Sequence, residues 1–277
     1  MSDRFAKVNG INICYSIQGE GHPLILSHGY GAKKEIWKAQ YELAKHFKLI
    51  TYDIRGLGKS DRPDMPYTME MLAEDVIGLM DYLDLDKAYI GGRSLGGMIS
   101  QNVYFNNPKR VMKLILITTN AGMPDQEGVE LLKNNIINQL QEFKKNPEEA
   151  FFKQARLFYH HSFRKEMERV PNKKFYGAFS AKNLIQEKLK NMPRPQDLAH
   201  IAEAIKTHNT RAKLSQIKCP TLLIAGSHDR LTPKTSMELM HHEILDSRLE
   251  IIQRAGHYLT LSKAPKVNQI ILNFLKQ

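Results

Sequence analysis

The 277-residue sequence contains only two cysteines and one tryptophan, and it has no long apolar run. Cys14 and Cys219 lie far apart and neither belongs to a C-x-x-C pair, so the sequence predicts neither a disulfide framework nor a zinc site. We expect both cysteines to be buried and reduced. No segment approaches the roughly 18 apolar residues of a membrane helix, and no apolar segment follows the N-terminal charges. We therefore expect a cytoplasmic protein without a membrane partner.

Basic residues outnumber acidic residues by 40 to 29, which gives a formal net charge of +11. The lysines and arginines occur mostly as isolated doublets among acidic residues. They are not accompanied by a helix-turn-helix, a zinc finger or an aromatic-basic RNA-binding signature. We interpret this excess as a solvated, lysine-rich surface and expect no nucleic-acid partner, while a weak attraction of acidic substrates stays open.

Short apolar segments alternate with amphipathic helical segments in residues 1–119 and again in residues 212–277. This alternation predicts an α/β fold with a mostly parallel central sheet and helices on both faces. Asn9-Gly10 should join the first two strands as an antiparallel hairpin at the sheet edge. Residues 120–211 show helical spacing without a convincing strand. They predict a helical cap over the carboxyl ends of the strands, where open α/β sheets bind ligands.

The centre of the pattern is Ser94, which lies between the apolar segment Ala88-Tyr89-Ile90 and a helical segment starting at Leu95. Gly92 and Gly96 flank it as G-x-S-x-G, and a sharp strand-to-helix turn needs small residues at these two positions. Ser94 would then stand at the tip of the turn as a nucleophile. The amide of Leu95 opens the helix and is free to donate to an oxyanion.

A serine nucleophile needs a base and usually a carboxylate that orients this base. Asp229 and His257 each follow a predicted strand of the second half, in the order Ser, acid, His that is typical of such turns. His241 and His242 are weaker candidates because they end a helix. Asp246 is weaker because it precedes a strand and so lies at the opposite end of the sheet.

Two further loops follow strands of the first half. His28-Gly29-Tyr30-Gly31 offers a second oxyanion donor, the amide of Tyr30, and we expect His28 to brace this loop rather than to exchange protons. The loop from Asp53 to Ser60 is rich in glycine but lacks the spacing of a phosphate-binding loop. We interpret it as structural, with Asp53 and Arg55 in local polar contacts.

Together these five motifs resemble the α/β-hydrolase superfamily in its cap-bearing branch, and their order along the chain makes the resemblance specific. The resemblance implies that Ser94 attacks, that His257 transfers the proton, that Asp229 orients His257 and that the amides of Tyr30 and Leu95 bind the oxyanion. It also implies a cap and no cofactor; no metal site is expected. The motifs look most like those of 3-oxoadipate enol-lactonases and small carboxylesterases.

The sequence therefore predicts a serine hydrolase that cleaves a carboxylic ester or lactone of a small molecule through an acyl-enzyme. Haloalkane dehalogenases and most epoxide hydrolases carry aspartate at the position of Ser94, which argues against both. A carbon–carbon bond hydrolase or an acyltransferase with the same triad is the alternative, and a non-catalytic ligand-binding protein is a third hypothesis. Carbon–carbon hydrolases typically have asparagine where this chain has Arg93, which either packs beside the turn or contacts an anionic substrate.

Overall fold

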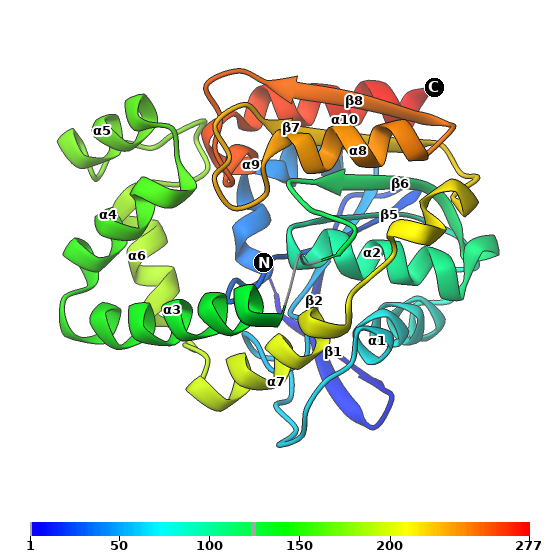
Figure 1. Cartoon of the computed structure of the whole chain (residues 1–277), viewed down its shortest axis with the longest axis horizontal. Coiled ribbons are helices and arrows are strands. Elements are labelled where there is room, and N and C mark those ends of the chain that lie inside the picture. Colours follow the sequence, from blue (N-terminus) through cyan, green and yellow to red (C-terminus); the bar gives the residue numbers. More distant parts are fainter. Residues whose placement is uncertain (1, 123–125) are drawn as a thin grey trace.

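A computed structural model describes residues 2–122 and 126–277 of the chain. Its strands form an eight-stranded sheet in the order β1-β2-β4-β3-β5-β6-β7-β8 (Figure 1). All neighbouring strands from β4 to β8 run parallel, whereas β2 pairs antiparallel with β1 and β4. The predicted mostly parallel sheet is therefore confirmed. The strands are β1 (Arg4–Val8), β2 (Ile11–Gln18), β3 (Pro23–Ser27), β4 (Lys48–Tyr52), β5 (Ala88–Arg93), β6 (Val111–Ile117), β7 (Thr221–Gly226) and β8 (Ser247–Ile252).

The predicted edge hairpin is formed by β1 and β2. Asn9 and Gly10 between them have positive φ angles of 48° and 79°. Positive φ at both central residues is the conformation of a type I′ turn, whose twist matches that of the flanking strands. This turn sets the register in which Val8 pairs with Ile11.

Helices cover both faces of the sheet and enclose two clusters of buried apolar side chains. On one face lie α1 (Met69–Tyr82), α2 (Leu95–Asn106) and α8 (Lys234–Glu243), and on the other lie η1 (Lys34–Lys45) and α10 (Ala264–Lys276). Thr68 caps α1, because its side chain accepts a hydrogen bond from the amide of Met71 at 3.1 Å. The short helices are η2 (Pro108–Arg110), η3 (Arg211–Gln216) and α9 (Leu259–Ser262).

The sequence from Trp37 to His46 has helical spacing, but the helix η1 is a 3-10 helix that begins three residues earlier, at Lys34. Its start is fixed by a distant residue, because the amide of Lys34 donates to the Asp53 carboxylate at 2.8 Å. The expectation for the cysteines is correct for Cys14, which is buried in β2. It is wrong for Cys219, which is only partly buried because it lies in the bend before β7.

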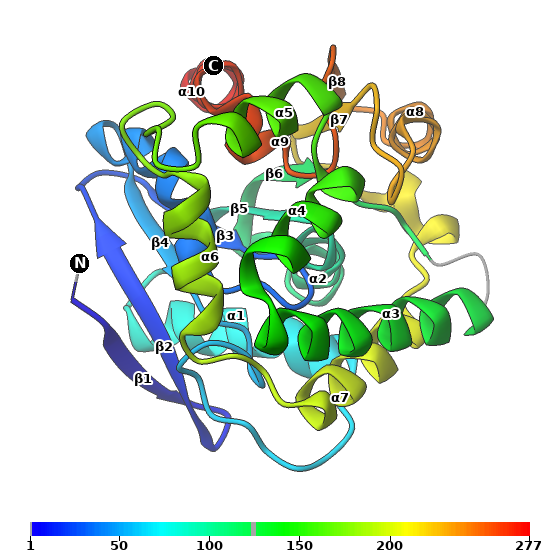
Figure 2. The ribbon, with the colours of Figure 1, turned by 90° about the vertical axis from the view of Figure 1, so that its left-hand side faces the viewer.

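In the described part of the chain, five inserted α-helices precede η3 between β6 and β7, on the side to which the arrowheads of β6 and β8 point in Figure 1. They are α3 (Gln126–Lys145), α4 (Pro147–Phe158), α5 (His161–Arg169), α6 (Ala181–Leu189) and α7 (Pro195–Thr207). Figure 2 shows α3, α4, α6 and α7 in front of the strands. The predicted cap range, 120–211, also includes residues 123–125, which lie outside the described residues.

The inserted helices pack around an aromatic-rich cluster that includes Phe143, Phe151, Phe175 and Phe179 and extends to Ala39, Leu261 and Ala264 of the core. The sequence of helix α5 is mostly polar, and Met167 is its one buried residue. In residues 2–122 and 126–277, none of the helices is both long enough and apolar enough to cross a bilayer.

Candidate active site

Ser94 lies at the sharp turn between β5 and α2, with φ 56° and ψ −120°. A positive φ is unusual for a residue with a side chain and marks local backbone strain. The turn is possible only with glycine on both sides. A Cβ on Gly92 would lie 2.2 Å from the carbonyl carbon of Gly96, and a Cβ on Gly96 would lie 2.0 Å from the carbonyl oxygen of Ser27.

Two hydrogen bonds hold the strained serine backbone. The amide of Ser94 donates to the carbonyl oxygen of Ile117 at 2.9 Å, which continues the pairing of β5 with β6. The Thr119 hydroxyl donates to the carbonyl oxygen of Ser94 at 2.8 Å. These contacts fix the position from which the Ser94 side chain projects.

Asp229 and His257 form a buried pair on the loops that follow β7 and β8. Nδ1 of His257 lies 2.8 Å from Oδ2 of Asp229, and the two residues are 3% and 8% exposed. Three further donors hold the carboxylate: the amides of Leu231 and Thr232 bind Oδ1 at 2.9 and 3.1 Å, and the Thr232 hydroxyl binds Oδ2 at 2.8 Å. The carboxylate therefore keeps His257 in one orientation, with the proton on Nδ1 and a free lone pair on Nε2.

Burial and charge together hold the pKa values of both His257 and Asp229 below their usual values. Burial lowers the pKa of His257 below that of free histidine, and the Asp229 carboxylate opposes this lowering only in part. Burial also raises the pKa of Asp229, but the contacts with His257 and Thr232 outweigh it, so the net pKa lies below its usual value. Near neutral pH the site thus holds an ionised Asp229 and an uncharged His257.

The loop after β3 carries the second predicted oxyanion donor, the amide of Tyr30. His28 braces this loop as expected. It is fully buried, its Nδ1 donates to the carbonyl oxygen of Gly29 at 2.9 Å, and its Nε2 accepts from the amide of Ile54 at 3.1 Å. Burial lowers the pKa of His28 and keeps it uncharged. The Tyr30 hydroxyl donates to the carbonyl oxygen of Leu198 in α7, so this loop is also tied to the inserted helices.

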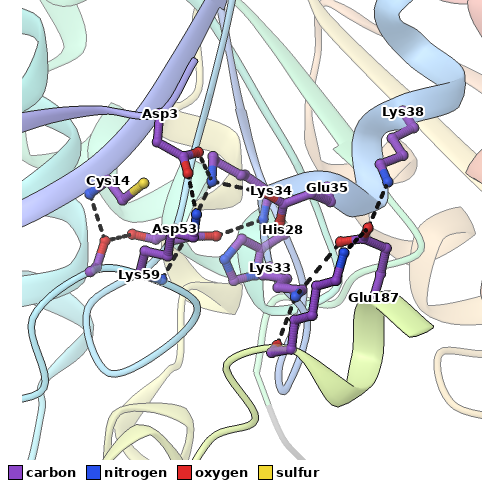
Figure 3. A network of polar contacts seen from close by, with 12 residues as sticks. Asp3, Cys14, His28, Lys33, Lys34, Glu35, Lys38, Asp53, Lys59 and Glu187 are labelled. Atoms are coloured by element: carbon purple, nitrogen blue, oxygen red, sulfur yellow. Dashed lines mark hydrogen bonds and ion pairs between the residues drawn. The ribbon is translucent and has the colours of Figure 1, made fainter. Parts of the chain in front are cut away.

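The Asp53–Ser60 loop is structural, as expected, and Figure 3 shows its central carboxylate. Asp53 accepts from the amide of Lys34 at 2.8 Å and from the amide of Lys59 at 3.0 Å, and it pairs with the Lys34 ammonium at 3.4 Å. Arg55 forms a buried ion pair with Asp75 in α1. The contacts of Asp53 join the loop after β4 to the start of η1, and the amide of Ile54 in the same loop binds His28.

Figure 3 also shows how the core is joined to the inserted helices. Lys38 in η1 lies 3.5 Å from the carboxylate of Glu187 in α6, and the Lys33 ammonium donates to the carbonyl oxygen of Lys190 at 2.8 Å. These contacts are partly exposed, so each stabilises the junction only weakly. These contacts attach α6 to η1 and to the residue just before it, Lys33.

Arg93 packs beside the serine turn and is 1% exposed. Its guanidinium carbon lies 4.0 Å from the centre of the Tyr258 ring, a cation–π contact, and the backbone of Gly29 lies against its other side. Among the residues that the structure describes, no carboxylate pairs with Arg93, and its buried Nε has no hydrogen-bond partner. The chain thus keeps an uncompensated positive charge beside the turn.

A cavity of about 280 Å³ lies between the core and α3 and α4; we call it the Ser94 cavity. It brings together Ser94 and Leu95 of one turn with Tyr30 and His257, which sequence reasoning had placed on two other loops. Asp229 lies behind His257. Among the contacts of the described residues, no hydrogen bond joins the Ser94 hydroxyl to His257. Within residues 2–122 and 126–277, no group of His, Cys, Asp and Glu side chains has the arrangement of a metal site.

A second cavity, of about 130 Å³, lies beside the first; α4 lines it mainly with apolar side chains, whereas η1 and α6 contribute mostly polar and charged ones. Phe158 and Tyr258 line both cavities, and their rings stack with centroids 4.5 Å apart and an interplanar angle of 9°. This pair therefore separates the two spaces.

Sequence reasoning missed several residues that shape the site. The most important is Thr232, which contacts both Asp229 and His257 Nδ1. Its position three residues after Asp229 is the spacing of a local turn in which a carboxylate accepts backbone and hydroxyl donors, and that spacing could have identified it. Tyr258 and Phe158 carry no comparable signal, since an aromatic residue in a loop or helix is usually a packing residue.

The comparisons with known proteins agree with this fold. A family model described as alpha/beta hydrolase fold matches residues 22–264. The enol-lactonase from Burkholderia xenovorans LB400 superposes with a TM-score of 0.82 at 26% sequence identity, over 99% of this chain and 100% of that chain. A thermophilic esterase from Thermogutta terrifontis superposes with a TM-score of 0.82 at 26% identity, over 100% and 98% of the two chains.

A relative with a different type of reaction has the same sequence identity to this chain. The 2-hydroxy-6-oxo-6-phenylhexa-2,4-dienoate hydrolase of Comamonas testosteroni is 26% identical, over 100% of this chain and 97% of its own length. The similar proteins thus act on substrates of different classes.

Proposed function

Because this chain belongs to the alpha/beta hydrolase family, we propose that it hydrolyses a carboxylic ester or lactone of a small molecule through an acyl-enzyme. The observation that carries the proposal is the buried contact of 2.8 Å between His257 and Asp229, in which His257 lines the same cavity as the strained Ser94. The similarity to an enol-lactonase and an esterase supports it.

In the proposed reaction, the Ser94 hydroxyl attacks the substrate carbonyl while Nε2 of His257 takes its proton. Asp229 stabilises the imidazolium that forms. The amides of Tyr30 and Leu95 donate to the oxyanion of the tetrahedral intermediate, and His257 then protonates the leaving alkoxide. A water molecule, activated by the same histidine, releases the acid and regenerates the free serine.

The test uses p-nitrophenyl esters of short acids. The purified protein should release p-nitrophenol, and Ser94→Ala should reduce kcat by roughly a thousandfold or more. A fluorophosphonate should label the wild type and not this variant. Ser100→Ala is the matched control, because Ser100 is a buried serine of α2 whose hydroxyl is engaged with the Gly96 carbonyl oxygen. Equal turnover or labelling in Ser94→Ala would refute the assignment.

The similarity to the Comamonas testosteroni hydrolase supports a second candidate, the hydrolysis of a carbon–carbon bond by the same triad. The two candidates are separated by a substrate panel that contains short esters, lactones and 2-hydroxy-6-oxo-6-phenylhexa-2,4-dienoate, with the acid products identified by chromatography. Adding an alcohol or a thiol to the ester assay tests acyl transfer, which would yield a new ester or thioester in place of the free acid. A fluorophosphonate that fails to label Ser94 would favour a non-catalytic binding protein.

A further inference from the structure

The Ser94 cavity has an unbalanced charge. Of its described lining residues, Arg93 and Arg230 carry a permanent charge, His257 can gain one, and none is aspartate or glutamate. A cationic substrate would meet only like charge there, whereas an anionic substrate would meet charges of opposite sign.

Arg230 is the member of this set that a substrate can reach. It is exposed and it lines the cavity, so it lies where the cavity meets solvent. Among the described residues it takes part in no ion pair, unlike Arg55, which pairs with Asp75, and Arg194, which pairs with Asp197. Its charge is therefore available to a ligand.

The backbone around Arg230 is fixed by the proposed catalytic acid. The amides of the next two residues, Leu231 and Thr232, both donate to Oδ1 of Asp229. Arg230 thus stands on a turn whose position relative to His257 is set by hydrogen bonds. Among the described residues, Arg230 forms no ion pair with the neighbouring Asp229 carboxylate, whose oxygens face these amides, Thr232 and His257.

The other walls of the cavity are mainly apolar, but they include two amide side chains that could bind the polar part of a small anion. Asn135 and Gln139, one turn apart on α3, line it with amide groups that can donate hydrogen bonds. Arg93 adds a buried positive charge behind Tyr258. Arginine binds carboxylates with two parallel hydrogen bonds, which fix orientation as well as charge.

We propose that Arg230 is a specificity residue that binds a carboxylate group of the substrate, so that the natural substrate is an ester or lactone that also carries a carboxylate. This proposal rests on the proposed function, because it concerns the substrate of the same Ser94 site. It assigns no step of bond cleavage to Arg230, which acts only on substrate binding and orientation.

Two matched pairs of esters test the proposal. The first pair is p-nitrophenyl hydrogen glutarate and p-nitrophenyl pentanoate, which differ by a carboxylate on the acyl side. The second pair is 4-butanoyloxybenzoic acid and its methyl ester, which differ by a carboxylate on the leaving group. The Ser94→Ala variant supplies the background rate. In at least one pair, kcat/KM for the anionic ester should exceed that for its neutral partner by roughly tenfold or more at low ionic strength.

Arg230→Gln should bring this ratio close to one, and Arg230→Lys should keep part of it. Arg169→Gln is the matched control, because Arg169 is an exposed arginine of α5 that does not line the cavity. It should keep the wild-type ratio. Added salt should lower the ratio for the wild type and leave that of Arg230→Gln unchanged.

The outcomes are distinguishable. Ser94-dependent hydrolysis with a ratio near one in both pairs would overturn this proposal and leave the proposed function intact. The same would follow from a high ratio that Arg230→Gln retains. If none of the four esters is cleaved in a Ser94-dependent way, the proposed function fails and this proposal fails with it.

Discussion

Asp229→Asn is the substitution whose outcome the structure defines most closely. The two oxygens of Asp229 have different partners, since Oδ1 accepts from the amides of Leu231 and Thr232 whereas Oδ2 faces His257 Nδ1 and the Thr232 hydroxyl. An asparagine in this place must keep its oxygen at the Oδ1 position, because a backbone amide cannot accept a hydrogen bond. Its NH2 group is then forced towards His257.

This orientation reverses the hydrogen bond to the base. The new NH2 group donates to Nδ1 of His257, so the ring proton moves to Nε2, the nitrogen that must accept the proton of Ser94. The folded structure changes little, because asparagine has the size of aspartate and two of the contacts persist. We expect kcat to fall by about 10³- to 10⁴-fold, the range found when a triad carboxylate is neutralised, while KM stays within a few-fold.

The assay is steady-state hydrolysis of p-nitrophenyl butyrate over the pH range, together with ¹⁵N NMR of the histidine ring. The wild type should show a protonated Nδ1 at His257, and the variant a protonated Nε2. Thr232→Val serves as a comparison. It removes one donor to Oδ2 without reversing the bond, so its loss should be far smaller. A kcat within tenfold of the wild type in Asp229→Asn would refute the proposed role of this pair.

Three further outcomes follow from burial and packing. Protonation of His257 removes the base, and burial lowers the pKa of this histidine. The acid limb of the pH profile of kcat/KM should therefore have a midpoint below about 6.5, the pKa of a free imidazole. A midpoint above this value would contradict the proposed role of His257. Burial lowers the pKa of His208 to about 4. Between pH ~6.5 and pH ~4 the unfolded chain binds a proton at His208 that the folded chain does not bind, so the free energy of unfolding falls as the pH falls through this range. Urea unfolding at pH 7 and pH 4.5 should show this loss, up to about 3 kcal/mol, and His208→Gln should reduce it. Phe158→Ala removes one ring of the stacked pair between the two cavities. In a p-nitrophenyl ester series from C2 to C12, this variant should therefore accept longer acyl chains than the wild type. An unchanged chain-length profile would contradict the role of Phe158 in separating the cavities.

The turns of the core could be predicted because their backbone conformations admit only a few residue types. Gly92 and Gly96 are required by backbone contacts of about 2 Å, and any sequence that makes this turn must show them. The positive φ angles of Asn9 and Gly10 likewise demand residues that tolerate them. The positions of Asp229 and His257 followed from the rule that loops at the carboxyl ends of parallel strands meet at one edge of the sheet.

What could not be predicted depends on contacts between distant segments. The start of η1 at Lys34 is set by Asp53, 19 residues later in the chain. The orientation of Arg93 depends on Tyr258, which periodicity does not connect with the serine turn. Helix α5 has too few apolar residues to stand out from a loop, and it is held by packing within the aromatic cluster of the inserted helices.

The core and the inserted helices also differ in the groups that they contribute to the proposed reaction. Each group proposed to take part in bond cleavage lies on the core and is held by buried backbone contacts: Ser94 by Ile117 and Thr119, and the Tyr30 loop by His28. The inserted helices contribute apolar and amide side chains to the cavity walls, and their ties to η1 are partly exposed. Substitutions in α3 and α4 should therefore alter KM and substrate preference more than kcat on a given ester, whereas substitutions in the core loops should do the opposite. The sequence motifs accordingly predict the reaction class, and we propose that the choice of substrate depends on the side chains of α3, α4 and the Arg230 loop.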